Sequence, residues 1–198
     1  MDAFVDTLQD FVQNKKALVA CVIVMINPLF WNVVSRYEYK TQKLSRTLGG
    51  PKRGCATLAA CILTLNYVRT ATFHKTVDEF GYWEPLHNGM VQALGYLIVT
   101  AGSVLVVASA WKLGFFVSFM GDYFGILLTD KVTGFPFNVV RDPMYFGSGL
   151  VYLGLSLEHA SVVGLVLTSC IAFSYAVAVR FEGPFTCQIY EERNKKSD

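Results

Sequence analysis

Long apolar runs are the feature that most restricts what this chain can fold into. Residues 88–111, NGMVQALGYLIVTAGSVLVVASAW, contain no charged side chain. A helix rises 1.5 Å per residue, so this run covers the roughly 30 Å hydrocarbon core of a bilayer. Further apolar runs lie at 17–34, at about 54–73 and at 143–181. Backbone polar groups inside a bilayer must bond internally, so we predict an all-α integral membrane protein, a bundle of transmembrane helices.

Composition supports this class and limits the partners. Only 16% of the residues are charged, against about 25% in a typical soluble domain. The length of 198 residues suits a single membrane-embedded domain, 1–198. A formal charge of +2 is too small to indicate a nucleic-acid partner. The five cysteines form no CxxC and the three histidines have no ligand-like spacing, so we expect neither a disulfide framework nor a metal site.

Two apolar runs are not simple crossings. Asn27-Pro28 interrupts the run 17–34, and proline removes a helix hydrogen bond, so a kinked span and a re-entrant segment are both retained. The run 143–181 is too long for one crossing. Asp142 followed by Pro143 is a typical helix start, and Ser161 could cap a second helix. We therefore predict a C-terminal helical hairpin, with legs of roughly 143–158 and 161–181.

The basic residues predict an orientation. Of the 17 lysines and arginines, thirteen lie in 35–53, in 112–146 and in the tail from Arg180. With five crossings these segments share one face, which the positive-inside rule assigns to the cytosol. The terminal KKSD resembles a dilysine retrieval signal. We expect a multi-pass protein of the endoplasmic reticulum membrane, with its C-terminus in the cytosol.

A charged turn opens the hairpin, at FNVVRDPMYFGSG, residues 137–149. Since both ends of a hairpin lie on one face, Arg141, Asp142 and Tyr145 can meet Glu182 there. The segment 112–138 is apolar and aromatic but lacks helical periodicity, which suits an interfacial segment lying over a pocket. The sequence thus predicts a site that faces the cytosol.

Four stretches carry a resemblance to a known family: NPLFWNVVSRYEYKT, MGDYFGI, VTGFPFNVVRDPMYFGS and FEGPFTCQIY. Together they resemble the phosphatidylethanolamine N-methyltransferases of the phospholipid methyltransferase family, over about residues 26–192. A wider membrane-methyltransferase group, which includes isoprenylcysteine carboxyl methyltransferases, shares only the Arg-x-Pro-x-Tyr-x-Gly core and a downstream glutamate.

The resemblance implies S-adenosylmethionine as cofactor and stepwise methylation of phosphatidylethanolamine, through its mono- and dimethyl forms, to phosphatidylcholine. The family's Gly-x-Gly falls on Thr100-Ala101-Gly102, and its Glu-Glu pair falls on Glu182-Gly183, so each motif loses one residue here. Arg141 is a candidate partner for the cofactor's carboxylate. Tyr145 is a candidate to pack on the cofactor or to order it.

Methyl transfer to an amine suggests further roles. The amine must lose its proton, and a carboxylate general base contributes about 10²–10⁴-fold. Aromatic faces stabilise the methylated cation. The candidate bases are Asp122, Asp142 and Glu182, and the candidate aromatic groups for the substrate are Tyr123, Phe124 and Phe146.

Two other functions are retained as alternatives, a prenylcysteine carboxyl methyltransferase and a non-catalytic lipid-binding or transport protein. The sequence leaves open which methylation step is preferred and whether the protein forms a homo-oligomer. Gly95, Ala101, Gly102 and Ser103 would let helices approach closely whatever the cofactor does. Trp31, Trp83 and Trp111, near segment ends, are expected to be interface anchors.

Overall fold

The computed structural model describes residues 2–130 and 132–197, and these form helices and connecting loops without strands. The predicted all-α bundle with a C-terminal hairpin is therefore confirmed. The α-helices are α1 (Asp2–Gln13), α2 (Lys15–Thr41), α3 (Lys43–Leu48), α4 (Pro51–Phe80), α5 (Gly89–Ser118), α6 (Pro143–Glu158) and α7 (Val162–Ser197). Two 3₁₀ turns complete the set, η1 (Glu84–Leu86) and η2 (Gly121–Phe124).

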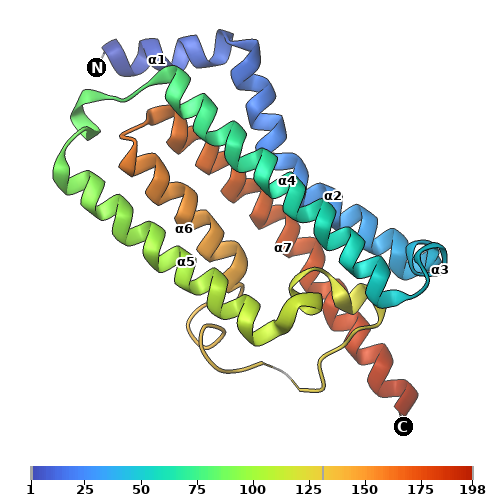
Figure 1. The fold of residues 1–198 in the computed structure, drawn as a ribbon. Helices are drawn as coiled ribbons and strands as arrows, with labels where there is room; N and C mark the ends of the chain where they lie inside the picture. The colour runs from blue at the N-terminus through green and yellow to red at the C-terminus, as the bar shows by residue number, and fades with distance from the viewer. Residues whose placement is uncertain (1, 131, 198) are drawn as a thin grey trace.

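The long helices run alongside one another, as Figure 1 shows. Helix α7 packs against α2 and α6, α4 packs against α2, and α6 lies between α5 and α7. Helix α1 lies across one end of the bundle. At the other end, the loop between η2 and α6 runs past α7 and below the ends of α5 and α6.

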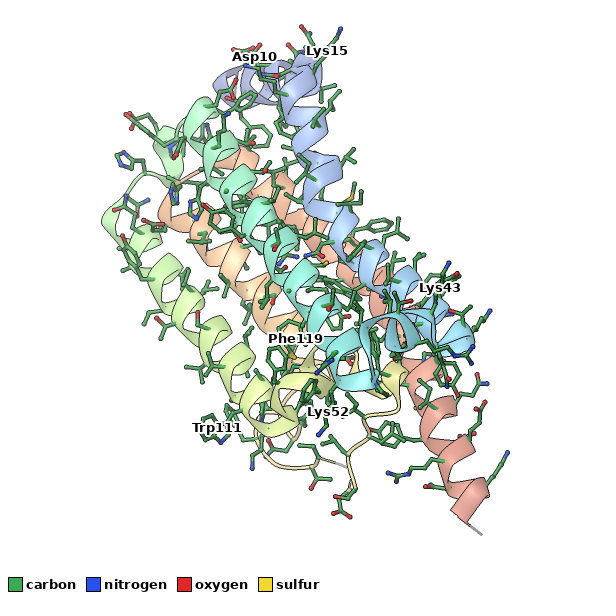
Figure 2. All side chains as sticks on the ribbon, turned by 45° about the vertical axis from the view of Figure 1, so that its right-hand side comes forward. Asp10, Lys15, Lys43, Lys52, Trp111 and Phe119 are labelled. Atoms are coloured by element: carbon green, nitrogen blue, oxygen red, sulfur yellow. The ribbon has the colours of Figure 1, made fainter. Side chains whose placement is uncertain are left out.

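The apolar surface of the bundle fits a bilayer. Helices α2, α5 (continued through η2) and α7 are long and apolar enough to span a membrane. Helix α6, with 16 residues, is shorter than a full crossing. Figure 2 places Asp10 and Lys15 at one end of the bundle and Lys43 and Lys52 at the other. Between these ends, α2 exposes an apolar row that a soluble protein would bury, formed by Val19, Val22, Ile26, Leu29 and Val33.

Helix α2 continues through Pro28, so the re-entrant alternative for 17–34 is wrong. Asn27 and Pro28 are both buried, and the Asn27 side-chain amide donates to Oδ1 of Asn66 on α4 at 2.8 Å. The side-chain amide of Asn32 donates to the Pro28 carbonyl at 3.1 Å. The bond to Asn66 ties the interrupted region to α4, and the bond to Pro28 gives its carbonyl, next to the interruption, a partner within α2.

The contact between α5 and α6 depends on glycine. A Cβ atom on Gly102 would lie 2.5 Å from the carbonyl oxygen of Gly147, and one on Gly95 would lie 2.8 Å from that of Gly154. Both distances are too short for a real side chain, so only glycine lets the two backbones come this close. The expected close helix approach is confirmed at Gly95 and Gly102, but it is wrong for Ala101 and Ser103, which are exposed.

The hairpin forms with its predicted turn but a longer second leg. Helix α6 begins at Pro143, and the Ser161 hydroxyl accepts from the Gly164 amide at 3.1 Å, which caps α7. The predicted end of this leg at residue 181 is wrong, because α7 continues through Pro184 to Ser197. Pro184 has no N–H group, so the Arg180 carbonyl lacks its usual helical partner. Both residues are exposed, so water can bond to that carbonyl.

The start of segment 112–138 is more helical than predicted. Helix α5 extends to Ser118, with a break at Gly114, where φ is +71°. A left-handed conformation is readily available to glycine. The break is followed by η2 and then an irregular loop, and both lie over the cavity described next.

Candidate active site

The hairpin, η2 and the helices α2, α4 and α5 together enclose a cavity of about 320 Å³. Drug-sized ligands occupy sites of roughly this size and above. The residues of the charged turn, Arg141 and Asp142, line it together with Tyr145 and Glu182. The structure thus brings together in one cavity the four residues that the predicted hairpin places on one face of the membrane.

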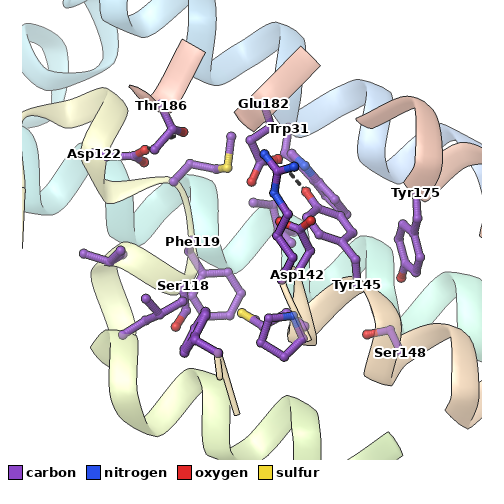
Figure 3. Close-up of a pocket in the computed structure, with 18 of the residues that line it drawn as sticks. Trp31, Ser118, Phe119, Asp122, Asp142, Tyr145, Ser148, Tyr175, Glu182 and Thr186 are labelled. Carbon is purple, nitrogen blue, oxygen red and sulfur yellow. Dashed lines mark hydrogen bonds between the residues drawn. The ribbon is translucent and has the colours of Figure 1, made fainter. Parts of the chain in front are cut away.

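A side-chain hydrogen bond joins Tyr145 directly to Glu182. The Tyr145 hydroxyl, in the first turn of α6, donates to Oε2 of Glu182 on α7 (Figure 3). Among the described side chains, no lysine or arginine nitrogen lies within 4.0 Å of the Glu182 carboxylate. The carboxylate is therefore held by a neutral donor and keeps lone pairs for a ligand.

Trp31 completes this cluster from α2. Its ring lies 6.2 Å from that of Tyr145, centroid to centroid, and only 8% of its surface is exposed. Its indole nitrogen is buried and makes no well-aligned hydrogen bond among the described residues, although it interacts with the Tyr145 hydroxyl and the Glu182 carboxylate. A buried donor without a well-aligned partner is costly, so this N–H group is suited to a ligand that enters the cavity. The expectation that Trp31 is an interface anchor is wrong.

Asp122 is the second buried carboxylate of the cavity, with 6% of its surface exposed. The Thr186 hydroxyl donates to its Oδ2 at 3.0 Å. Thr186 follows Glu182 by four residues on α7, so both side chains lie on the same helix face. In Figure 3, Asp122 and Thr186 lie on one side of the Tyr145–Glu182 pair, and Tyr175 lies on the other.

The residues matched to the family's Gly-x-Gly do not line the cavity. Thr100 and Ala101 are exposed on α5, and the Thr100 hydroxyl donates to the Tyr96 carbonyl of its own helix at 2.8 Å. Gly102 packs against α6. Gly183 is half-buried beside Glu182, and a Cβ atom there would meet nothing within 4 Å.

The three predicted aromatic groups also lie outside this lining. Tyr123 and Phe124 are buried, and Tyr123 stacks on Phe185 with ring centroids 5.2 Å apart. Phe146 is 51% exposed and lines an apolar groove between α6 and α7. The aromatic rings beside Glu182 are instead those of Trp31 and Tyr145.

Sequence reasoning missed several lining residues, and one of them carried a signal. Arg69 lies in an apolar run, where an ionisable side chain usually marks a functional site. It lies near the end of the run 54–73, and the structure buries it on α4. The other missed polar or aromatic lining residues include Asn66, Ser148, Tyr175, Thr186 and Tyr190.

Comparison with known proteins gives a consistent result. The family model described as phospholipid methyltransferase matches residues 90–193. Phosphatidylethanolamine N-methyltransferase of Homo sapiens is 44% identical over 174 residues, which cover 88% of this chain and 87% of the human protein. Phosphatidyl-N-methylethanolamine N-methyltransferase of Saccharomyces cerevisiae is 42% identical over 92% of this chain and 89% of its own.

A more distant relative extends the range of organisms. Phosphatidylethanolamine N-methyltransferase A of Dictyostelium discoideum is 36% identical over 94% of this chain and 89% of its own. No solved structure matches the chain. The matched region 90–193 contains Asp122, Tyr145 and Glu182. On this evidence the chain belongs to the phospholipid methyltransferase family.

Proposed function

We propose that this protein transfers methyl groups from S-adenosylmethionine to the amine of phosphatidylethanolamine and of its mono- and dimethyl derivatives, and so forms phosphatidylcholine. Family membership and the names of the relatives support this reaction. The observation that carries it is the Tyr145–Glu182 pair, a buried carboxylate without a cationic partner that lies beside the indole N–H of Trp31.

The residues present fit the cofactor. S-adenosylmethionine, when bound, supplies an electrophilic methyl group on a sulfonium cation. Arg141, exposed at the cavity, can hold a carboxylate through charge-assisted hydrogen bonds. The Trp31 N–H can donate to a polar atom inside, and the apolar lining, which includes Leu113 and Val117, can contact the less polar parts of the ligand.

Glu182 is our candidate for the general base. The Tyr145 hydroxyl holds one carboxylate oxygen, and the carboxylate keeps lone pairs that can accept the proton of the substrate amine. We favour Glu182 over Asp122 and Asp142 because the rings of Trp31 and Tyr145 lie beside it. Those rings can stabilise the charge that forms as the amine becomes a quaternary cation.

We also propose that the protein resides in the endoplasmic reticulum membrane with this cavity facing the cytosol. Lys43 and Lys52 lie at the end of the bundle where the loop over the cavity gathers. That end carries the excess of basic residues, as the positive-inside rule requires. The terminal KKSD supports the same location.

Transfer of labelled methyl groups tests this function. The purified full-length protein in lipid nanodiscs would receive methyl-labelled S-adenosylmethionine with phosphatidylethanolamine, its monomethyl form or its dimethyl form. We expect label in all three lipids. Label only in the methylated substrates would restrict the activity to the later steps, the activity for which the yeast relative is named. A prenylcysteine substrate is given in a fourth assay, and label there but not in the lipids would support the carboxyl methyltransferase alternative. No transfer to any of the four substrates would support a non-catalytic role.

A further inference from the structure

A buried arginine lies at the far side of the cavity from Asp122. Arg69, on α4, is 5% exposed and lines the cavity. Its Nε donates to the Tyr152 hydroxyl at 3.1 Å, and its Nη1 donates to the Tyr175 hydroxyl at 2.6 Å. Among the described side chains, no carboxylate oxygen lies within 4.0 Å of its guanidinium. A cation inside a membrane bundle is costly without an anionic partner, so this charge requires an explanation.

The surroundings of Arg69 leave donors for an anion. A guanidinium has five N–H donors, and the hydrogen bonds to Tyr152 and Tyr175 account for two of them. The guanidinium carbon also lies 5.1 Å and 5.5 Å from the ring centroids of Tyr152 and Tyr175. A tyrosine hydroxyl that accepts from arginine can still donate its own proton. Arg69 and Tyr175 therefore offer several donors to a group that is rich in acceptor oxygens.

The position of this pair points to a lipid. Tyr175 precedes Glu182 by seven residues on α7, which is about 10 Å along the helix. Its ring lies 5.1 Å from that of Tyr145, which bonds Glu182. The cavity thus has a cation at one position and a carboxylate about two helical turns away. A zwitterionic headgroup, with an amine and a phosphate joined by a short linker, has the complementary charges.

A second observation separates the lipid from the soluble cofactor. Tyr175 and Tyr145 also line the apolar groove between α6 and α7, in which Phe146 is exposed. The arginine–tyrosine pair therefore adjoins the place where the cavity meets the lipid-facing surface. In a phospholipid, the phosphate is the group that joins the headgroup to the apolar chains.

We propose that Arg69 and Tyr175 bind the phosphate of the phospholipid substrate, so that its amine reaches Glu182 and an acyl chain lies in the groove between α6 and α7. This inference rests on the proposed function and names a specificity determinant for it. The competing anion is the carboxylate of the cofactor, for which Arg141 at the cavity is the better partner.

The test compares two lipids and three variants of the full-length protein in mixed micelles. The substrates are phosphatidyl-N,N-dimethylethanolamine and its phosphate methyl ester, which keeps the amine but has no phosphate charge. The variants are Arg69→Gln, Arg69→Lys and a matched control, Arg180→Gln, which removes an exposed charge from α7 outside the cavity lining. Binding of S-adenosylmethionine alone is measured in parallel.

We expect the wild type and Arg180→Gln to prefer the charged lipid. Arg69→Gln should lower kcat/KM for the charged lipid by about 10–100-fold, as for lost hydrogen bonds to a charged group, and should abolish the preference. The dissociation constant of the cofactor should not change. Arg69→Lys, which keeps the charge but not the fork of donors, should retain part of the preference.

Three results would overturn the inference. If Arg69→Gln still prefers the charged lipid, other residues bind the phosphate. Weaker cofactor binding in Arg69→Gln would assign Arg69 to the cofactor. If Arg69→Gln does not fold, Tyr175→Phe decides, because full retention of the preference would exclude this site. A wild type that methylates no lipid amine would instead contradict the proposed function.

Discussion

The Tyr145 hydroxyl donates a hydrogen bond to Glu182 across 37 residues of chain, from one leg of the C-terminal hairpin to the other. This bond joins the charged turn before α6 to the glutamate on α7. It forms because an antiparallel hairpin returns to the face on which it began. The candidate chemistry of the protein therefore depends directly on the topology of its last two long helices.

Loss of that bond should slow catalysis without unfolding the protein. Tyr145→Phe keeps the ring but leaves Glu182 without its donor, and we expect kcat to fall by about 10–100-fold, as for other hydrogen bonds to charged groups. Steady-state methylation of the dimethyl lipid measures this. Tyr96→Phe is the matched control, since it removes a tyrosine–glutamate bond, to Glu158, at the other end of the bundle. Equal losses in both variants would contradict a specific role for Tyr145.

The indole N–H of Trp31 should matter for the ligand more than for the fold. Trp31→Phe keeps an aromatic ring in the core but removes the N–H group, so it should lower kcat/KM by about tenfold, as for one lost hydrogen bond, while the smaller ring lowers the unfolding temperature only modestly. Thermal denaturation and kinetics on the same preparation check both statements. Trp111→Phe, at an 86% exposed position, serves as the control. Unchanged kinetics in Trp31→Phe would exclude a ligand contact at this nitrogen.

Gly102 should be sensitive because of packing. Gly102→Ala places a Cβ atom 2.5 Å from the Gly147 carbonyl oxygen and should destabilise the protein by about 1–3 kcal/mol. Gly89→Ala, on the same helix but with no atom within 4 Å of the added Cβ, should be nearly neutral. Thermal unfolding in detergent compares Gly102→Ala with Gly89→Ala.

Thr100→Ala should leave the affinity for the cofactor unchanged. Weaker cofactor binding in Thr100→Ala would show that the cofactor extends to this side of α5.

The end of the chain beyond the cavity should be reachable from the cytosol. A variant that retains Cys187 as its single cysteine exposes that thiol on α7, five residues after Glu182. A membrane-impermeant maleimide added to sealed microsomes should label it. His87→Cys in a variant without any other cysteine, in the connection before α5, should react only after permeabilisation. The reverse pattern would invert the proposed orientation.

The hairpin could be predicted because its signals are local. Proline after Asp142, the interruption before Ser161 and the long apolar run are all visible in the sequence, and the meeting of Tyr145 with Glu182 follows from them. The length of α7 could not be predicted, since Pro184 usually ends a helix and is tolerated here at an exposed position.

The deeper part of the cavity could not be predicted from hydropathy. A membrane helix is apolar on its lipid-facing and its core-facing sides, so periodicity does not tell which side of α2 carries Trp31 inward. Arg69 gave a signal, but its tyrosine partners come from α6 and α7, and sequence spacing does not place these side by side. The glycines of α5 illustrate a third difficulty, because a motif assigned to a cofactor also satisfies close helix packing.

The most direct test of the account replaces Glu182 with glutamine and follows methyl transfer from labelled S-adenosylmethionine to the three lipid amines. Glu191→Gln, at an exposed position outside the cavity lining, serves as the control. We predict that the wild type and Glu191→Gln label the lipids. Glu182→Gln should bind the cofactor but lose about 10²–10⁴-fold in kcat, the contribution typical of a general base. Wild-type rates in Glu182→Gln would contradict the central claim that methyl transfer takes place beside the Tyr145–Glu182 pair.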